Sequence, residues 1–171
     1  MTHILIIGGG TGGIMTAAQL LKKGNVKVML LEPAEFHYYQ PAWTLVGSNT
    51  YNFEKTKRTM ASVMPDGVNW VKEFADKFDP ANNSVITTAG TEINYDYLVV
   101  SPGIKIDPSL VEGLSEAMDK GVVCSNYTGS STHLGSPKKL QRRHGFIHTT
   151  RNTNKMWWRS SKNHVFGGGT L

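Results

Sequence analysis

The chain has 171 residues, of which 39% are hydrophobic, a mean hydropathy of −0.28 and a formal net charge of +5. This length suits one ordinary globular domain with a core of useful size. No apolar run approaches the roughly 18 residues of a membrane-spanning helix, and the single cysteine, Cys124, excludes an internal disulfide. The start Met1-Thr2-His3 leads directly into an apolar run, so we expect no signal or transit peptide.

The positive charge is concentrated in the last quarter of the chain. Residues 1–127 contain ten Lys and Arg and thirteen Asp and Glu, whereas residues 128–171 contain eight Lys and Arg and no acidic residue. Such an abrupt change marks a boundary between two parts with different properties. We therefore expect one domain over residues 1–127 and a basic tail of low order over residues 128–171.

The first thirty residues predict a strand, a helix and a second strand. His3–Ile7 is a short apolar run with β-branched residues, which is typical of a buried parallel strand. Thr11–Lys23 places its apolar residues on one face of a helix, and Gly24-Asn25 ends that helix. Val26–Leu31 predicts a second buried strand, so the order is β-α-β.

After residue 32, the sequence patterns that predict secondary structure are shorter. Aromatic residues and prolines without a clear period favour loops over residues 33–65. The pattern then predicts a strand over Val68–Phe78 and a turn at "DPANN". A hairpin from "SVITT" to "EINYDYLVV" follows and returns to the core. The last predicted elements are a turn at Ser101-Pro102-Gly103 and a short strand over residues 122–124.

The glycine cluster between the first strand and the helix fits the dinucleotide-binding pattern G-x-G-x-x-G at Gly8, Gly10 and Gly13. The first glycine permits the tight turn, the second lets a diphosphate approach the backbone, and the third lets the helix pack close to the sheet. Gly12 adds conformational freedom, and Thr11 can donate its hydroxyl. The N–H groups and partial positive charge at the helix N-terminus favour phosphate.

The acidic residue that this pattern requires is also present. Glu32 lies at the end of the second strand, 19 residues after Gly13, where a carboxylate can hold ribose hydroxyls. A carboxylate at this position repels a 2′-phosphate, which argues against NADP. The pattern itself does not choose between NAD and FAD.

Four later blocks carry a resemblance to a known family. The blocks "EPAEFHYYQPAWTLVG" (32–47), "RTMASVMPDGVNWVKE" (58–73), "YDYLVVSPGIKID" (95–107) and "VCSNY" (123–127) together resemble the sulfide:quinone oxidoreductases. The resemblance covers residues 3–127. It implies an α/β fold with a Rossmann-like FAD-binding β-α-β unit and an added β-hairpin or meander. It also implies that the chain is an incomplete version of a flavoprotein with two dinucleotide-binding domains.

The resemblance implies which residues would contact the cofactor, FAD. Thr11 and Gly12 would contact the diphosphate, and Glu32 would contact the adenosine ribose. Gln40 would reach the flavin nucleotide, Ala75 would meet the adenine through its backbone, and Gly103 belongs to the turn that closes against the FAD. No catalytic residue is expected, because the two redox cysteines of the family lie in segments that this chain lacks. No metal-binding residue is expected either. Cys124 belongs to neither segment and is interpreted as structural.

The resemblance also implies the reaction, the partners and the location of the parent enzyme. That enzyme oxidises sulfide and passes the electrons through FAD to a membrane quinone, at the matrix face of the mitochondrial inner membrane. A cytoplasmic location stays open, because no transit peptide is visible. We expect this chain alone to be inactive. The alternatives are a non-catalytic module that holds FAD or NAD, and a fragment of another flavoprotein such as a type II NADH dehydrogenase.

The tail over residues 128–171 has no sustained period and is interpreted as disordered. It resembles the next segment of the same family read in a shifted frame. Met156-Trp157-Trp158 allows only one codon for each residue, and a shift by one base converts these codons to Cys-Gly-Gly, as in the family's "PIKCGGAPQK". A nucleic-acid-binding tail and a folded C-terminal subdomain are the other two interpretations, and we expect no nucleic-acid partner.

Overall fold

The computed structural model describes residues 1–47, 50–120, 125, 145–147 and 156–158. The chain divides into two compact units: Met1–Gln40 with Glu54–Lys105, and Pro41–Phe53 with Ile106–Leu171. Every residue of the predicted nucleotide site lies in the first unit. The expected strand over residues 122–124 and Cys124 itself fall outside the described residues.

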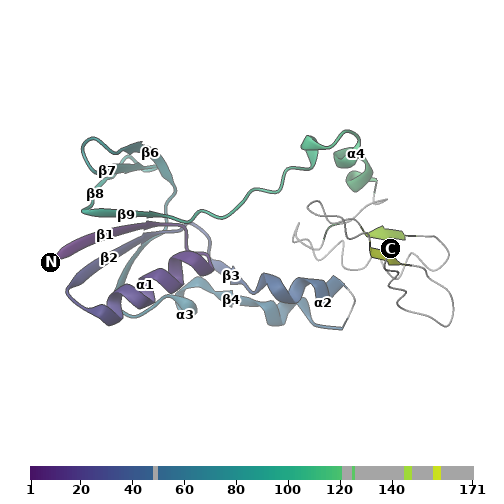
Figure 1. Ribbon diagram of the computed structural model, residues 1–171, viewed down its shortest axis with the longest axis horizontal. Coiled ribbons are helices and arrows are strands. Elements are labelled where there is room, and N and C mark those ends of the chain that lie inside the picture. The colour runs from purple at the N-terminus through teal and green to yellow at the C-terminus, as the bar shows by residue number, and fades with distance from the viewer. Residues whose placement is uncertain (48–49, 121–124, 126–144, 148–155, 159–171) are drawn as a thin grey trace. The chain divides into compact units, whose positions relative to one another are not determined.

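A parallel sheet forms the centre of the first unit, with the strand order β5-β2-β1-β9 (Figure 1). Each neighbouring pair of strands is parallel. The helix α1, Thr11–Lys23, connects β1 to β2. The strands are β1 (Thr2–Ile7), β2 (Val26–Leu31), β5 (Val68–Val71) and β9 (Tyr97–Val100). The predicted β-α-β unit is therefore confirmed.

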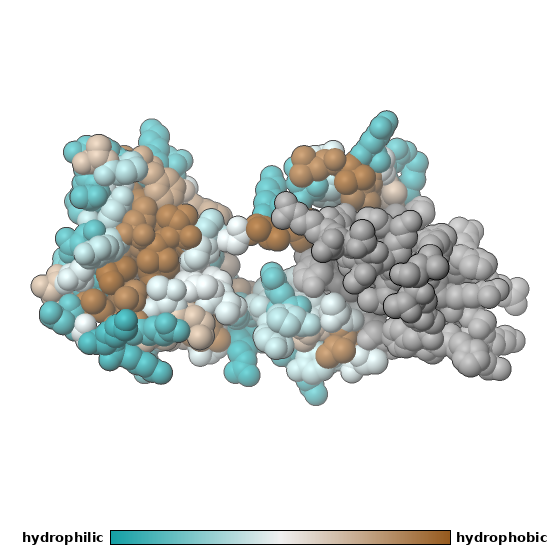
Figure 2. Space-filling view, in the orientation of Figure 1, coloured by the Kyte–Doolittle hydropathy of each residue, from teal (hydrophilic) through white to brown (hydrophobic). Residues whose placement is uncertain are grey.

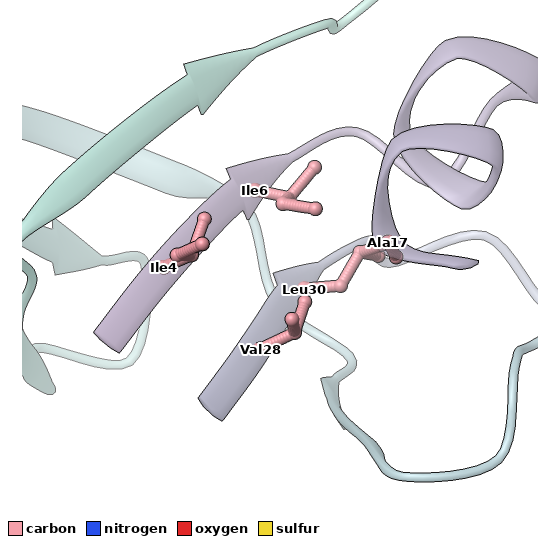
Figure 3. Packing of buried hydrophobic residues seen from close by; sticks show 5 residues of the cluster. All are labelled: Ile4, Ile6, Ala17, Val28 and Leu30. Atoms are coloured by element: carbon pink, nitrogen blue, oxygen red, sulfur yellow. The ribbon is translucent and has the colours of Figure 1, made fainter. Parts of the chain in front are cut away.

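The two faces of this sheet are buried against different elements. On one face, side chains of β1 and β2 pack with α1 (Figure 3), and the cluster comprises Ile4, Ile6, Ala17, Val28 and Leu30. On the other face, β1 and β2 pack against a second sheet, and the cluster comprises Leu5, Ile7, Leu31, Val85 and Ile93. Because neighbouring residues of a strand point to opposite faces, a strand buried on both faces appears in the sequence as an unbroken apolar run.

The second sheet of this unit is antiparallel, with the order β6-β7-β8. Its strands are β6 (Ala75–Asp79), β7 (Ser84–Thr87) and β8 (Glu92–Asn94). The prediction of one strand over Val68–Phe78 is wrong: the chain leaves the parallel sheet after Val71 and enters the antiparallel sheet at Ala75. The predicted hairpin that returns to the core is confirmed, since β9 follows β8 and pairs with β1.

Residues 33–65 contain short elements where the sequence favours loops. The strands β3 (Phe36–Tyr38) and β4 (Lys57–Thr59) pair antiparallel. The short helices are α2 (Trp43–Gly47) and α3 (Met60–Val63), with 3₁₀ turns at Gln40–Ala42 and Phe53–Thr56. Each element has five residues or fewer, which is too short for a strand or helix period to show in the sequence.

The later part of the chain also contains short elements. A 3₁₀ turn spans Pro108–Leu110, and the helix α4 spans Leu114–Asp119. The strands β10 (Gly145–Ile147) and β11 (Met156–Trp158) pair antiparallel. Most of the tail for which we expect disorder lies outside the described residues. Among the residues that are described, no helix is long and apolar enough to cross a bilayer.

The outer edge of the parallel sheet is apolar. β9 is the last strand of the order, so one of its edges carries no further strand within the described chain. Its side chains Tyr97 and Val100 are exposed, and Figure 2 shows apolar side chains gathered over this part of the first unit. An apolar edge strand of this kind favours pairing with other chains.

Candidate functional site

The candidate site lies where the parallel strands end. Gly8 follows β1, Glu32 follows β2, and Ser101 follows β9. Each of the three positions donates its N–H to a neighbouring strand: Gly8 to the Leu31 carbonyl (2.9 Å), Glu32 to the Val71 carbonyl (3.0 Å) and Ser101 to the Ile7 carbonyl (2.8 Å). In open parallel sheets, ligands bind in the crevice outside the carboxyl ends of the strands.

Two glycines of the loop are required by packing within the protein. Gly8 has φ +101°, and a Cβ there would lie 2.3 Å from the Ser101 carbonyl oxygen. A Cβ on Gly13 would lie 1.9 Å from the Gly8 carbonyl oxygen. Both contacts are with backbone atoms, which cannot move aside as a flexible side chain can. Gly13 therefore allows the start of α1 to lie against the end of β1, and Gly8 allows the loop to lie against the turn after β9.

Gly10 differs from the other two, because no atom of the described residues lies where its Cβ would be. A Cβ on Gly10 would meet no atom within 4 Å, and its φ of −70° suits any residue. Gly10 is exposed together with Thr11 and Gly12, while Gly8, Gly9 and Gly13 are buried. The open space beside Gly10 is what a diphosphate close to the backbone needs.

The N-terminus of α1 presents free donors on this open side. Gly10 caps the helix without any side-chain hydrogen bond, and the first turn contains no acidic residue. The first N–H groups of a helix have no intrahelical acceptor, and the N–H group of Ile14 is bonded to the Gly10 carbonyl (3.0 Å). The donors of the first turn and the helix dipole together favour an anion at this point.

Glu32 is held beside the loop by hydrogen bonds to both of its carboxylate oxygens. The Gly9 N–H donates to Oε2 (2.7 Å), and the Ala34 N–H donates to Oε1 (2.8 Å). The indole N–H of Trp70 donates to the Glu32 carbonyl (2.8 Å). The carboxylate is thus fixed next to the glycine loop, and each oxygen keeps a lone pair for a further donor such as a ribose hydroxyl.

Ser101 connects the last strand to the loop. Its hydroxyl donates to the carbonyl oxygens of Ile7 (3.1 Å) and Gly8 (3.4 Å). Gly103, two residues further, is exposed with φ +78°, and a Cβ there would meet no atom within 4 Å. The turn is therefore anchored at Ser101, and Gly103 lies on its open side.

The two remaining predicted residues lie further along the chain. Ala75 begins β6 and packs against the apolar cluster that contains Ile7 and Leu31, the residues directly before Gly8 and Glu32. Gln40 is exposed in the 3₁₀ turn Gln40–Ala42, and among the described residues no hydrogen bond joins it to the glycine loop. The expected contacts of Ala75 with the adenine and of Gln40 with the flavin nucleotide stay predictions.

Sequence reasoning noted Gly9 in the glycine cluster and Ser101 in a turn, but it did not predict the contacts by which Gly9, Trp70 and Ser101 shape the site. Gly9 supplies the N–H group for Glu32, and a Cβ on it would lie 2.6 Å from the Glu32 Cγ. Trp70 and Ser101 act through residues that are distant in sequence. The sequence does indicate Gly9: the G-x-G part of the pattern needs glycine only at positions 8 and 10, but position 9 is also glycine.

The residues present fit the adenosine diphosphate part of a dinucleotide. The open space at Gly10 and the free donors of α1 suit the diphosphate, and the oriented Glu32 carboxylate suits the ribose beside it. Gly10, Thr11 and Gly12 are all exposed on this side of the loop.

Comparisons with known proteins agree with this site. The model of the pyridine nucleotide-disulphide oxidoreductase family matches residues 2–169. Mitochondrial sulfide:quinone oxidoreductase of Dictyostelium discoideum is 43% identical over 133 residues, which are 77% of this chain and 29% of that protein. The chain thus spans about 29% of the length of this relative.

Two solved structures are also similar. The sulfide:quinone oxidoreductase of Aquifex aeolicus is 27% identical with a TM-score of 0.58, covering 82% of this chain and 32% of that one. NDH2 of Plasmodium falciparum, solved with NADH, has a TM-score of 0.54 at 18% identity over 67% of this chain and 25% of that one, and this similarity shows the fold alone. The resemblance to sulfide:quinone oxidoreductases and the class of cofactor, FAD, are confirmed, and the chain belongs to the pyridine nucleotide-disulphide oxidoreductase family.

Proposed function

We propose that the first unit of this chain binds FAD by its adenosine diphosphate half. The observation that carries the proposal is the contrast at the glycine loop: Gly8 and Gly13 are required by packing, whereas Gly10 faces open space. A glycine that the protein itself does not need is explained by a ligand that lies against the backbone. Glu32 would hold the ribose, and the amides of Thr11 and Gly12 would hold the diphosphate.

We also propose that the parent protein is a sulfide:quinone oxidoreductase. FAD, when bound, supplies two-electron redox chemistry, and the protein supplies binding and orientation. The identity of 43% to the Dictyostelium discoideum enzyme supports this assignment over a type II NADH dehydrogenase, whose solved relative is 18% identical. The mitochondrial name of that relative supports a mitochondrial location, and we keep the matrix face of the inner membrane as part of the proposal.

The 171-residue chain does not oxidise sulfide by itself in this proposal. The chain contains one cysteine, Cys124, whereas the proposed parent chemistry needs a pair. Purified chain reconstituted with FAD should therefore show no sulfide-dependent reduction of decylubiquinone. Turnover of sulfide would contradict the inactivity of the chain and leave FAD binding untouched.

The binding experiment compares FAD with FMN. The two share the flavin ring, but only FAD carries the adenosine diphosphate half for which the site is built. We expect the chain to bind FAD and not FMN, with ADP competing for the same site, as measured by flavin fluorescence. Equal binding of FMN, or no binding of FAD, would contradict the proposal. NAD, titrated in parallel, tests the alternative of a non-catalytic module that accepts either dinucleotide.

The shifted-frame origin of residues 128–171 remains part of the proposal. It explains eight basic residues without an acidic one as a by-product of translation, with no nucleic-acid partner. Sequencing the transcript across the Tyr127 codon tests it. One inserted or deleted base should restore "PIKCGGAPQK"; a transcript in which neither neighbouring frame encodes this segment would contradict it.

A further inference from the structure

The main chain of Glu32 is bonded to the strand β5 on both sides of its Cα. The Glu32 N–H donates to the Val71 carbonyl (3.0 Å), and the Glu32 carbonyl accepts the indole N–H of Trp70 (2.8 Å). The first bond joins two backbone groups and does not depend on the identity of either side chain. The second bond exists because residue 70 is a tryptophan. One side chain of the neighbouring strand therefore helps to set the position of Glu32.

The Glu32 carbonyl lies just beyond the end of the ladder between β2 and β5. The last paired residues of this ladder are Leu31 and Val71, and after Val71 the chain leaves the parallel sheet for β6. A partly buried carbonyl beyond the last pair needs a donor from another source. The indole N–H of Trp70 is this donor, and it comes from the residue that is paired with Leu30 in the ladder.

The ring of Trp70 is itself held in place. It packs against the apolar cluster that contains Val28 and Leu30, and the ammonium group of Lys72 lies over it, 4.6 Å from its centroid. An indole N–H that is withdrawn from water needs an acceptor, because an unpaired buried donor is costly. Packing thus fixes the ring, and the N–H group of the ring fixes the Glu32 carbonyl.

The position of the Glu32 main chain decides where its carboxylate lies. The Gly9 N–H donates to Oε2 (2.7 Å), and the Ala34 N–H donates to Oε1 (2.8 Å). Both distances are at the short end of the range for N–H···O bonds, so a small shift of the main chain would weaken the bond to Gly9. A carboxylate without that bond is no longer held beside the glycine loop.

We propose that Trp70 is a positioning residue for ribose recognition. Its indole N–H holds the Glu32 main chain so that the carboxylate can accept a hydrogen bond from the ribose 2′-hydroxyl. A binding group is most effective when hydrogen bonds from neighbouring residues lock its own position. Trp70 itself does not touch the nucleotide. This inference rests on the proposed FAD binding and adds to it the residue that sets the geometry of the ribose contact.

The test measures how ADP and 2′-deoxy-ADP displace FAD from the chain, because these competitors differ only in the 2′-hydroxyl. We expect the wild-type chain to prefer ADP by about 10-fold, since the deoxy compound lacks a hydrogen bond to a charged group. Trp70→Phe keeps an aromatic ring and removes the donor, so the ratio of affinities should fall to about 3-fold or less. Glu32→Ala gives the ratio in the absence of the ribose contact.

Two further variants separate positioning from folding. Trp43→Phe makes the same change at a buried tryptophan of α2, in the other compact unit, and should keep the wild-type ratio. Benzothienylalanine in place of Trp70 has the shape of tryptophan without its N–H group. It should lower the ratio as Trp70→Phe does, and it provides the same test if Trp70→Phe does not fold. Thermal unfolding without ligand is measured for every variant.

The outcomes separate this inference from the proposed function. A wild-type chain that does not bind FAD contradicts the proposed function, and the inference with it. If FAD binds but the two competitors displace it equally from the wild type, the role of Trp70 is overturned and FAD binding stands. A merely structural Trp70 would lower the melting temperature on substitution and weaken both competitors by the same factor. An unchanged ratio in a folded Trp70 variant therefore overturns the inference as well.

Discussion

The β-α-β unit at the start of the chain and the segment over residues 33–65 differ in how the sequence encodes them. In the first, Leu5, Ile6, Val28, Leu30 and Leu31 are at most 1% exposed, and the two strands and the helix each have six residues or more. In the second, no element exceeds five residues. The comparison teaches that strands buried on both faces can be recognised in the sequence as apolar runs. Short elements cannot, because they depend on contacts with residues that are distant in sequence.

The largest expected effect tests this difference in burial directly. Leu30 lies in a cluster with four other buried residues and seven partly buried neighbours, so Leu30→Ala should cost about 4 kcal/mol of unfolding free energy. Met60 is 2% exposed in the short helix α3 and belongs to neither apolar cluster, so Met60→Ala should cost about 2 kcal/mol. Urea unfolding of the two variants and the wild type measures both losses of unfolding free energy. Equal costs would contradict the contrast between the two regions.

The next effect concerns the junction between β1 and α1. Gly13→Ala places a Cβ 1.9 Å from the Gly8 carbonyl oxygen, so the helix must shift away from the strand. We expect a loss of about 3 kcal/mol of stability from this overpacking. The matched control is Gly24→Ala, at a position with open space but a φ of +74°, which isolates the cost of the backbone conformation. A Gly13→Ala variant as stable as the wild type would show that the junction is looser than described.

The smallest expected effect is a pH dependence of folding stability, caused by Asp79 in the turn between β6 and β7. The side-chain amide of Asn82 (2.7 Å) and its backbone N–H (3.2 Å) donate to the Asp79 carboxylate and lower its pKa below the ordinary value. A lowered pKa in the folded state gives a stabilisation that is present above the pKa of the unfolded chain. This stabilisation is lost as the pH falls through the lower pKa of the folded chain.

Carboxyl NMR of Asp79 provides the measurement for this turn. In the wild type the titration midpoint should lie below the usual value for aspartate. In Asn82→Ala it should move upward, because the strongest of the donors is removed. Since Asp79 is only partly buried and close to solvent, the effect on stability should be small. An unchanged midpoint in Asn82→Ala would show that the hydrogen bonds do not persist in solution.

Much of the first unit could be predicted from its sequence, because the signals there are local. The run from His3 to Ile7, the glycine pattern and the acidic end of β2 each specify a structure within a few residues. The break between β5 and β6 could not be predicted, because no glycine or proline marks it and the change of sheet depends on pairing with β2 and β7.

The same distinction applies to the candidate site. Gly8, Gly10, Gly13 and Glu32 follow from spacing alone, and the structure brings the glycine loop and Glu32 together. The hydrogen bonds of Ser101 and Trp70 could not be predicted in this way, since each joins residues more than 35 positions apart in the chain. The expected contacts of Gln40 and Ala75 came from the family resemblance and stay predictions, since neither residue shares a hydrogen bond with the glycine loop among the described residues.

The central claim is that Gly10 is kept for a ligand and not for the fold, and Gly10→Ala tests it most directly. Thermal unfolding without ligand and FAD titration should be measured on the same preparation, with the wild type beside it. We predict a change in stability of less than about 1 kcal/mol, together with a loss of FAD affinity of about 10-fold or more, because the added methyl group occupies the space of the diphosphate. Unchanged FAD affinity in a folded Gly10→Ala variant would contradict the account.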